Sequence, residues 1–495
     1  MSVRNHYVII ISIDFQKAFD SISREMLINV MKRYKIHPKI IDLIAEIYTN
    51  DKTKMFLNDK EICEIEITNG IRQGCNGSTL LFLLVTYEII NKLEEHRKGK
   101  GFRNEKFSIP ILYYADDGLL LSHTHEEARE NIRKIQEIAQ EYGLVVNKEK
   151  SNIIIFNEEH QPENIEGINV TTNITYLGVK IYNSRRPFTE FKKDRIMRAS
   201  KLSNMTYSII ARSCNRLMIG KTFWKGLGLA TVLYGAELID YTEKDLICLQ
   251  RIENAVYRTI LQVPTYTASS ALRGEVGATS AKARDMKIKI LFSKHLLEEN
   301  RNQLIKEIFL LEYEEGKAQW IRLLKKYMKE LDLKLTDIEH QRRDTLIEKV
   351  KEWDTKQWLE EMEQKSTLHI YRKYKRHIQE EKWIDNTEGS KLLVRGRTNS
   401  LTLNWRNRHQ GKSEQCPACG HETETLEHFL LECASYNTIK TQFNFLQELQ
   451  NKSSEEKLTN ILILEKLTST EIEDRKSYMK AIWKTREKKT QQQQV

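Results

Sequence analysis

The chain has 495 residues and a net charge of +10, with 30% charged residues, 6 prolines and 20 glycines. This length is enough for two to four domains, and the scarcity of proline and glycine favours a helix-rich protein. The positive net charge favours a polyanionic partner such as nucleic acid, although a basic surface without such a partner would give the same net charge. Seven cysteines without a secretory signal argue against a disulfide framework, and no apolar run could span a membrane, so we expect an intracellular protein.

The first region of the chain mixes strand and helix patterns. Residues 8–13 form a continuous apolar, β-prone run, which is typical of a strand buried on both faces. Residues 64–67 alternate as a half-exposed strand does, and residues 174–182 are predicted as a final strand. Three stretches have apolar residues at helical spacing and are predicted as helices: 26–34, 40–48 and 80–90.

A fourth helix is predicted from its terminal signals. Thr124 and Glu127 form a capping box at its start, and Gly143 can end it. Beyond residue 188 the pattern is helical and rich in lysine, glutamate and leucine as far as about residue 380. The tail, residues 488–495, is glutamine-rich and is predicted to be disordered.

Two acidic residues, Asp116 and Asp117, lie side by side between apolar runs in the stretch LYYADDGLLLS. The simplest interpretation is a hairpin turn, because Asp-Asp-Gly suits a turn between two strands. Carboxylates at the tip of a buried hairpin repel each other unless a cation lies between them. A third acid, Asp14, ends the first predicted strand, so a sheet could gather three carboxylates into a site for a pair of Mg²⁺ ions.

Five segments occur in the order of palm motifs A to E of reverse transcriptases, and the chain resembles those of non-LTR (LINE-type) retrotransposons. They are DFQKAFDS (14–21), NGIRQGCNGSTLLF (69–82), YADDG (114–118), EYGLVVNKEKSN (141–152) and YLGVKI (176–181). The resemblance implies an α+β polymerase palm in which Asp14, Asp116 and Asp117 hold the metal ions. It also implies RNA-directed DNA polymerisation by two-metal attack of a primer 3′-hydroxyl on a deoxynucleotide.

Further roles follow from the resemblance position by position. Phe19 matches the aromatic residue under the incoming sugar, where its ring would clash with a 2′-hydroxyl. Gln73 and Gly74 match the turn that approaches the nucleotide and template, and Arg72 would lie near phosphate or be a solvated charge. Lys150 matches the motif D lysine that protonates the leaving pyrophosphate.

Two further matches concern the growing strand and proton transfer. Lys148 is a rival of Lys150 for the motif D role. Tyr176, Leu177 and Gly178 match the motif E hairpin that grips the primer end. Residues 231–238 (TVLYGAEL) resemble a segment of the thumb, which packs against duplex nucleic acid with basic helices.

The chain departs from the family pattern in two places. Thr79 follows the motif B serine where proline is usual, and only 13 residues precede Asp14, where the family has a longer fingers subdomain. We therefore expect an N-terminally truncated chain. The expected segments are a palm with fingers largely missing, a thumb-like helical region, a helical linker, a basic strip with a zinc knuckle, and a helical or disordered tail: 1–187, 188–300, 301–390, 391–440 and 441–495.

A cysteine and histidine cluster near the C-terminus has the spacing C-x2-C-x8-H-x4-C. Two cysteines two residues apart direct both sulfurs at one ion, and a histidine and a third cysteine complete a tetrahedral Zn²⁺ site. The predicted ligands are Cys416, Cys419, His428 and Cys433. His421 is a rival ligand, and a core histidine in a chance cluster is the alternative.

The residues just before this cluster are basic and contain an aromatic side chain among arginines. Stacking on the aromatic ring combined with phosphate contacts would make residues 395–409 a nucleic-acid-binding strip. The side chains predicted to act there are Arg395, Arg397, Trp405 and Arg406.

The expected partners are an RNA template, a DNA primer or target, and deoxynucleotides, within an RNA-protein particle of nucleus and cytoplasm. A catalytically inactive remnant that only binds RNA or DNA is the main alternative. An RNA-directed RNA polymerase would share the two-metal palm, but Phe19 and the YADD and YLG motifs argue against it.

Overall fold

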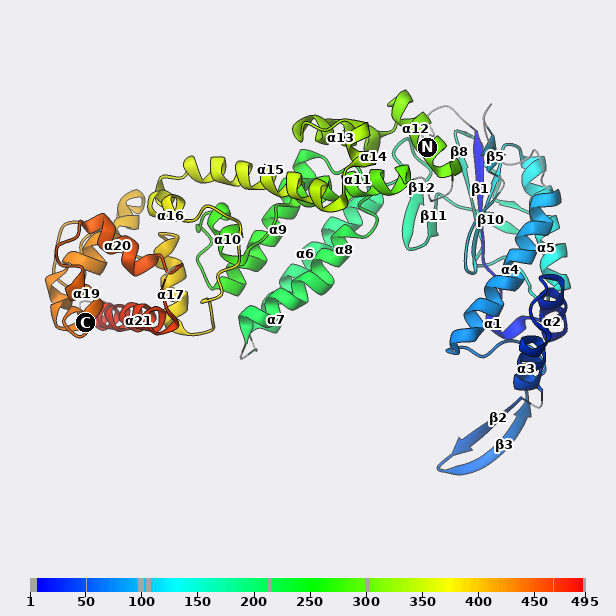
Figure 1. Ribbon diagram of the computed structural model, residues 1–495, viewed down its shortest axis with the longest axis horizontal. Helices are drawn as coiled ribbons and strands as arrows, with labels where there is room; N and C mark the ends of the chain where they lie inside the picture. The colour runs from blue at the N-terminus through cyan, green and yellow to red at the C-terminus, as the bar shows by residue number, and fades with distance from the viewer. Residues whose placement is uncertain are drawn as a thin grey trace. The chain divides into compact units, whose positions relative to one another are not determined.

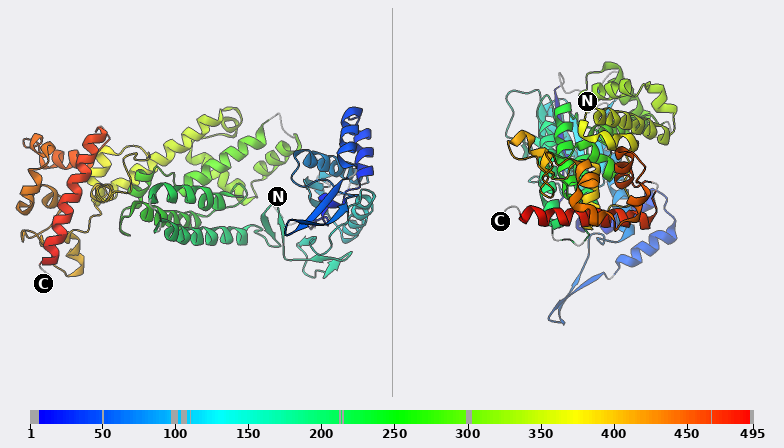
Figure 2. Two further views of the ribbon diagram at one scale, coloured as in Figure 1. Left: turned by 90° about the horizontal axis from the view of Figure 1, so that it is seen from below. Right: turned by 90° about the vertical axis from the view of Figure 1, so that its left-hand side faces the viewer.

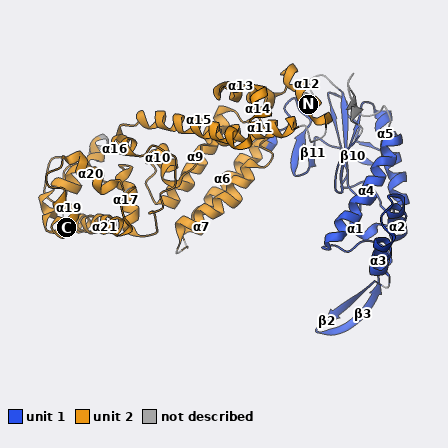
Figure 3. Cartoon of the chain, viewed as in Figure 1, with its two compact units in different colours: residues 1–191 blue, residues 192–495 orange. Residues whose placement is uncertain are grey.

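The computed structural model describes residues 7–49, 51–96, 102–103, 108–109, 111–211, 213, 215–298, 303–465 and 467–492. The chain divides into two compact units, Met1–Phe191 and Lys192–Val495, which Figure 3 distinguishes by colour. Among the described residues, no helix combines the length and the apolar character that crossing a membrane requires.

The first unit is built on a six-stranded sheet with the order β6-β7-β1-β8-β10-β9 (Figure 1). Neighbouring strands pair antiparallel except β8 and β10, which are parallel. The strands of this sheet are β1 (Val8–Ile13), β6 (Ile111–Tyr114), β7 (Asp117–Ser122), β8 (Asn152–Phe156), β9 (Asn164–Ile165) and β10 (Ile168–Val170). Three two-stranded sheets accompany it: β2 (Lys52–Leu57) with β3 (Lys60–Glu66), β4 (Phe102–Arg103) with β5 (Ser108–Ile109), and β11 (Asn173–Tyr176) with β12 (Val179–Tyr182). The helices are α1 (Ala18–Ser21), α2 (Arg24–Arg33), α3 (Pro38–Tyr48), α4 (Asn76–His96) and α5 (His125–Glu141).

Both faces of the central sheet are covered, which is why β1 is apolar at every position except Ser12. Ile9, Ile11 and Ile13 point to one face, where they join the core formed with α2, α4 and α5. The opposite face carries a smaller cluster that includes Ile154 and packs against Ile174 of the β11–β12 hairpin. The predicted mixed α+β architecture, the first strand and the four helices of this region are confirmed.

Two predicted strands differ from the structure. Residues 174–182 form a hairpin and not one strand, because Leu177 and Gly178 take φ angles of 48° and 74° and reverse the chain between β11 and β12. β3 ends at Glu66 and is exposed on both faces rather than half-buried, since the β2–β3 hairpin stands away from the rest of its unit (Figure 2).

The capping of α5 also differs from the prediction in one detail. The Thr124 hydroxyl accepts a hydrogen bond from the Glu127 N–H at 3.1 Å, as a capping box requires. The Glu127 carboxylate, however, accepts from the N–H of His123 at 2.9 Å and not from that of Thr124. Gly143 follows the helix with a φ of 80° and lies against the Ser21 carbonyl, where a Cβ would approach to 2.6 Å.

The regular secondary structure of the second unit, among its described residues, consists of helices and one isolated bridge between Val276 and Glu380. Its α-helices are α6 (Thr189–Ala211, which begins in the first unit), α7 (Arg216–Phe223), α8 (Ala230–Leu233), α9 (Glu243–Leu261), α10 (Ser269–Val276), α11 (Ala281–Leu297), α12 (Gln303–Glu315), α13 (Gln319–Glu330), α14 (Leu335–His340), α15 (Arg343–Glu363), α16 (His369–Tyr374), α17 (Glu388–Arg397), α18 (Asn437–Lys440), α19 (Asn444–Glu448), α20 (Ser454–Leu462) and α21 (Ser469–Gln492). A π-helix, His428–Glu432, contains the histidine of the predicted zinc site.

The glutamine-rich tail is the clearest error of the sequence interpretation in this unit. Its residues 488–492 continue α21, and residues 493–495 lie outside the described part. Tyr478, Met479, Ile482 and Trp483 of that helix are buried in a core that includes Phe429 beside the cysteine cluster. The helix persists because its preceding turns are anchored, which local composition does not reveal.

Candidate active site and metal centre

The three acids of the palm motifs meet at one end of the central sheet. β1 and β7 pair as far as Ile13 opposite Gly118, so Asp14 and Asp117 follow the last pair of this register, and the charges of Asp14 and Asp116 act on Asp117. Opposite residues of an antiparallel pair have Cβ atoms about 4.5–5.5 Å apart and point to the same face. Asp116 lies one residue earlier, in the turn that joins β6 to β7.

Backbone contacts fix this end of the sheet. The Asp14 N–H donates to the Ser151 hydroxyl at 3.1 Å, and the Asp14 carbonyl accepts from the Asn147 N–H at 2.8 Å. The β6–β7 turn needs a φ of 55° at Ala115. A Cβ on Gly118 would come within 2.7 Å of the Tyr113 ring, so the residue after the acid pair has to be small.

Like charges crowd this site. The pKa of the Asp117 carboxyl is raised by partial burial and then by the negative charges of Asp116 and Asp14. The pKa of Tyr176, in the β11–β12 hairpin, is raised by burial and by Asp117, which places that hairpin beside the acids. Within the described ranges, none of the three carboxylates forms an ion pair with a lysine or arginine. A cluster of carboxylate oxygens without a basic partner fits a divalent cation.

A pocket of about 430 Å³ brings together the residues predicted to receive the nucleotide. Phe19, Gln73 and Gly74 all line it. The Phe19 ring stacks on Phe82 with centroids 4.5 Å apart, which fixes its orientation. Gln73 donates to the Asp20 carboxylate at 3.2 Å, and Gly74 has a φ of 84°, a conformation that favours glycine.

Arg72 is held by a partner of its own. Its guanidinium contacts Asp51 at 2.8 Å, and Arg24 contacts the other oxygen of the same buried carboxylate at 2.8 Å. These two arginines lower the pKa of Asp51, the hydrogen bond from Arg72 being the largest cause. Arg72 is therefore not simply a solvated charge, and its contact with phosphate stays a prediction.

The motif D lysines lie on the turn that follows α5 and leads into β8. Lys150 has an exposed side chain, and its N–H donates to the Asn147 side chain, the residue whose own N–H bonds to Asp14. The Lys148 side chain instead extends toward Gly167 in the β9–β10 turn. These contacts do not bring either lysine side chain to the acids, so the choice of Lys150 over Lys148 for proton transfer stays a prediction.

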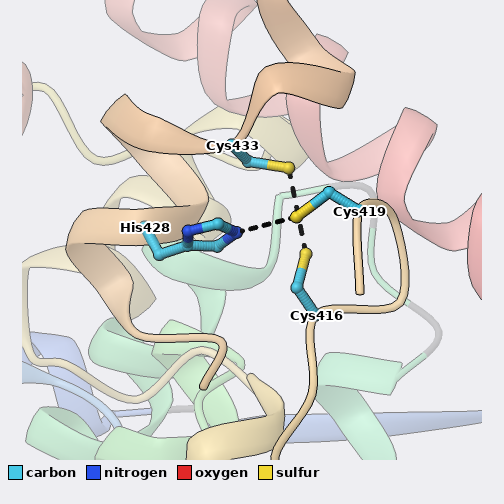
Figure 4. A group of neighbouring side chains, drawn as sticks. All are labelled: Cys416, Cys419, His428 and Cys433. Carbon is cyan, nitrogen blue, oxygen red and sulfur yellow. Dashed lines mark hydrogen bonds between the residues drawn. The ribbon is translucent and has the colours of Figure 1, made fainter. Parts of the chain in front are cut away.

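The predicted zinc ligands form one compact group (Figure 4). The Cys416 and Cys433 sulfurs are 3.8 Å apart, and the Cys419 sulfur is 3.3 Å from His428 Nε2. All four ligand atoms lie within 4.8 Å of one another. Two thiolates bound tetrahedrally at about 2.3 Å to one Zn²⁺ have sulfurs about 3.8 Å apart, so the donor set fits this ion.

The structure favours His428 over His421 as the ligand. His421 stacks on the His428 ring at 4.4 Å, but its Nδ1 lies 3.2 Å from the Thr423 carbonyl and it is absent from the ligand group. Lys440 donates to the carbonyls of Leu431 and Cys433, at 2.7 and 2.8 Å, and so holds the chain at the last cysteine. Sequence reasoning missed this lysine because only its three-dimensional position reveals the contact.

The predicted nucleic-acid-binding strip is wrong for Arg397. This residue is 1% exposed, and its guanidinium lies 3.2 Å from Glu275 and 3.3 Å from Glu381. Arg395 donates twice to the Gln262 carbonyl, and Arg406 packs over the rings of Tyr266 and Trp405. The arginines of this strip therefore bind protein groups, and nucleic-acid contacts by Arg395, Trp405 and Arg406 stay a prediction.

Arg397→Leu is expected to lower the free energy of unfolding by about 3–5 kcal/mol, because it leaves Glu275 buried without its cation and Glu381 with Lys375 alone. Urea unfolding followed by tryptophan fluorescence would measure the change. Arg342→Leu, at a side chain that is 86% exposed, is the matched control and should be close to wild type. Equal midpoints for the two variants would contradict a structural role for Arg397.

Parts of the chain are similar to known proteins. Residues 1–181 match the family described as reverse transcriptase (RNA-dependent DNA polymerase). The Pol polyprotein of the type-1 retrotransposable element R2 from Nasonia vitripennis is 29% identical over 202 residues, 38% of this chain and 19% of the relative. The corresponding R2 polyprotein of Bradysia coprophila is 32% identical over 143 residues, 29% of this chain and 16% of the relative. A solved telomerase from Candida tropicalis, in complex with a fragment of telomeric RNA, is similar at 14% identity over 62% of this chain and 50% of that one, with a TM-score of 0.30.

A mixed sheet that gathers three carboxylates at one end, with helices on one face, is the arrangement that the resemblance to a polymerase palm predicted for this region. Residues 1–181 match the reverse transcriptase family, and parts of the chain are similar to the Pol polyproteins of R2 retrotransposable elements. The matched regions span less than a quarter of the length of the R2 polyproteins named above.

Proposed function

We propose that the chain is an RNA-directed DNA polymerase of a non-LTR element. The observation that carries this proposal is the meeting of Asp14, Asp116 and Asp117 at the sheet end without a basic partner among the described residues. Three carboxylates in this state repel one another, and divalent cations relieve that repulsion. This arrangement of carboxylates does not stabilise the fold, whereas it suits metal-assisted phosphoryl transfer.

In the proposed reaction the primer 3′-oxygen forms a bond to the α-phosphorus of a deoxynucleotide, and pyrophosphate leaves. Two Mg²⁺ ions, held by the three aspartates, would supply Lewis acidity at the attacking and leaving oxygens. The Phe19 ring would support the sugar, and the Gln73–Gly74 turn would face the base pair being formed. Protonated Lys150 would donate a proton to the leaving pyrophosphate.

Phe19→Val is expected to admit ribonucleotides, because removing the ring opens the space where a 2′-hydroxyl would lie. The preference for dTTP over UTP, as the ratio of kcat/KM values, should fall about 10- to 200-fold, the range for one steric contact in a pocket. Competing incorporation of the two nucleotides on a poly(rA) template would measure it. Phe15→Val, at a buried ring before Phe19 that does not line the pocket, controls for a general loss of packing.

The second unit would contribute to nucleic-acid handling around the catalytic domain. The Cys416, Cys419, His428 and Cys433 group would hold one Zn²⁺ and fix the fold of its surroundings. The RNA template, the DNA primer and the deoxynucleotides are the proposed partners. An RNA-protein particle of the nucleus and cytoplasm is the proposed location.

Primer extension on poly(rA)/oligo(dT) with Mg²⁺ or Mn²⁺ tests the proposal. The wild-type chain should incorporate dTTP, and the double variant Asp116→Ala, Asp117→Ala should not. Absence of incorporation by wild type, together with salt-sensitive RNA binding by filter retention, would instead establish a non-catalytic RNA-binding chain.

A further inference from the structure

A pocket of about 710 Å³ lies within the second unit and is lined by residues of α9, α10, α11 and α15. Its charged lining consists of five basic and three acidic side chains. All three acids already have cations: Glu243 contacts Lys326 at 2.6 Å, and Arg273 contacts Asp354 at 2.8 Å and Glu361 at 3.6 Å. Among the described residues, Arg251, Arg258 and Lys365 form no ion pair, so the pocket has an excess of positive charge.

Two helices begin at this pocket, and they differ in how their first N–H groups are satisfied. At α11 the Ser280 hydroxyl accepts from the Ala283 N–H at 3.1 Å, and the Ala281 N–H donates to Gln250 at 2.9 Å. At α10 the N-cap residue is Ala268, which provides no side-chain acceptor. The first N–H groups of a helix carry partial positive charge and bind anions readily.

A second and independent feature of the pocket is an unpartnered buried hydroxyl. Thr267 lines the pocket, is 2% exposed, and its Oγ1 has no hydrogen-bond partner. Beside it, Arg258 donates through Nη2 to the Thr267 carbonyl at 3.2 Å, while Arg258 Nε has no partner. Leaving a buried polar group unsatisfied is costly, and a ligand with several acceptor oxygens would remove that cost.

We propose that this pocket binds a phosphate group. The α10 N-terminus, the Thr267 hydroxyl and the Arg258 guanidinium provide donors of three kinds in one pocket, and backbone N–H groups and arginine both bind phosphate well. A phosphate on a nucleic-acid strand and free inorganic phosphate share this chemistry. The inference does not depend on the polymerase activity proposed above, because it rests only on residues of the second unit.

Two variants of the full chain test the site, each with a matched control. Thr267→Val removes the hydroxyl at nearly constant shape, and Arg258→Gln removes the charge. Thr206→Val is the control for the first, since Thr206 is a buried threonine outside the pocket whose hydroxyl bonds to the Leu202 carbonyl at 2.8 Å. Arg342→Gln, at an exposed arginine outside the pocket, is the control for the second.

The first arm measures RNA binding by fluorescence anisotropy with a labelled single-stranded RNA over a range of KCl concentrations. If the phosphate belongs to a strand, Arg258→Gln and Thr267→Val should each raise Kd about tenfold. Arg258→Gln should also lower the slope of log Kd against log[KCl] by about 0.7, the value for one phosphate contact on a single strand.

The second arm measures the thermal midpoint with inorganic phosphate, against KCl of equal ionic strength. If the site takes free phosphate, the ion should raise the midpoint of wild type and of both controls but not of the two pocket variants. Without phosphate, Thr267→Val should be at least as stable as Thr206→Val, because it removes an unsatisfied group rather than a hydrogen bond.

The two arms together decide the proposal. A pocket-specific effect in either arm supports the phosphate site and identifies its source. Pocket variants that match their controls in both arms would overturn it. Neither arm measures nucleotide incorporation, so failure of the polymerase proposal would leave this result unaffected.

Discussion

Asp117→Asn is expected to reduce dTTP incorporation about a thousandfold while making the metal-free chain more stable. The loss of activity follows because an amide is a neutral and weaker ligand for a hard cation than a carboxylate. The gain in stability follows because burial and the charges of Asp116 and Asp14 raise the pKa of Asp117, so its charge opposes folding. The two effects have opposite signs, which an ordinary structural aspartate would not produce.

The dependence of this stability effect on pH has a definite sign. An aspartate whose pKa is raised by folding favours the folded state when it is protonated. That contribution is complete below the unfolded pKa, about 3.9, and is lost as the pH rises through the higher folded value. The stabilisation by Asp117→Asn should therefore be visible at neutral pH and disappear in acid, as thermal unfolding in EDTA would measure.

Asp42→Asn is the matched control for both measurements, since Asp42 is an exposed acid on α3, away from the sheet end. It should leave incorporation and the thermal midpoint close to wild type. A destabilised Asp117→Asn chain at neutral pH in EDTA would show that Asp117 is a structural hydrogen-bond acceptor. In that case the interpretation of the three acids as a metal site would lose its physical basis.

The sequence predicted those parts of the palm whose determinants are contiguous along the chain. The run at residues 8–13 implied a strand buried on both faces. In the structure, helices pack on one face of this strand and the β11–β12 hairpin packs on the other. Residues 174–182 were predicted as one strand from their composition, although the resemblance of Tyr176, Leu177 and Gly178 to the motif E hairpin implied a turn at this point. Glycine within a strand pattern indicates a bend, and Gly178 indeed has a positive φ where the chain reverses direction.

Long-range partners explain the remaining errors. Arg397 looks like a nucleic-acid contact because its neighbours are basic, yet Glu275, more than a hundred residues earlier, neutralises it in the core. The local sequence around Arg397 does not predict an ion pair with such a distant residue. The tail shows the same limit, since its low-complexity composition predicts disorder while Trp483, a few residues before it, anchors the helix in the core.

The cysteine and histidine cluster has one feature that its local sequence predicts and one that depends on a distant partner. Its four ligands were predictable from spacing alone, and the structure groups them as expected. The connection of the cluster to the rest of the unit could not be predicted from spacing. This connection runs through Glu424, which lies between the cysteine pair and the histidine in the sequence. This fully buried carboxylate receives two hydrogen bonds from Arg486 of α21, at 2.6 and 2.7 Å. The cluster is therefore part of a larger core and not an isolated knuckle.

Removing the metal is consequently expected to affect more than the cluster itself. Cys433→Ser should abolish bound zinc, measured as metal content per purified chain by mass spectrometry. It should also lower the thermal midpoint of the second unit by roughly 10 °C, because structural zinc contributes folding free energy directly. Prolonged treatment of the wild-type chain with a chelator should reproduce the shift, and added Zn²⁺ should reverse it.

Cys248→Ser is the matched control, because Cys248 is an exposed cysteine of the same unit outside the ligand group. It should keep one zinc per chain and an unchanged midpoint. If Cys433→Ser lost its zinc without a change in the midpoint, the connection through Glu424 and Arg486 would be sufficient to hold this core together. The metal would then serve only the loop that carries Cys416 and Cys419. The buried position of Cys433, within the same apolar core as Phe429, argues for the larger effect.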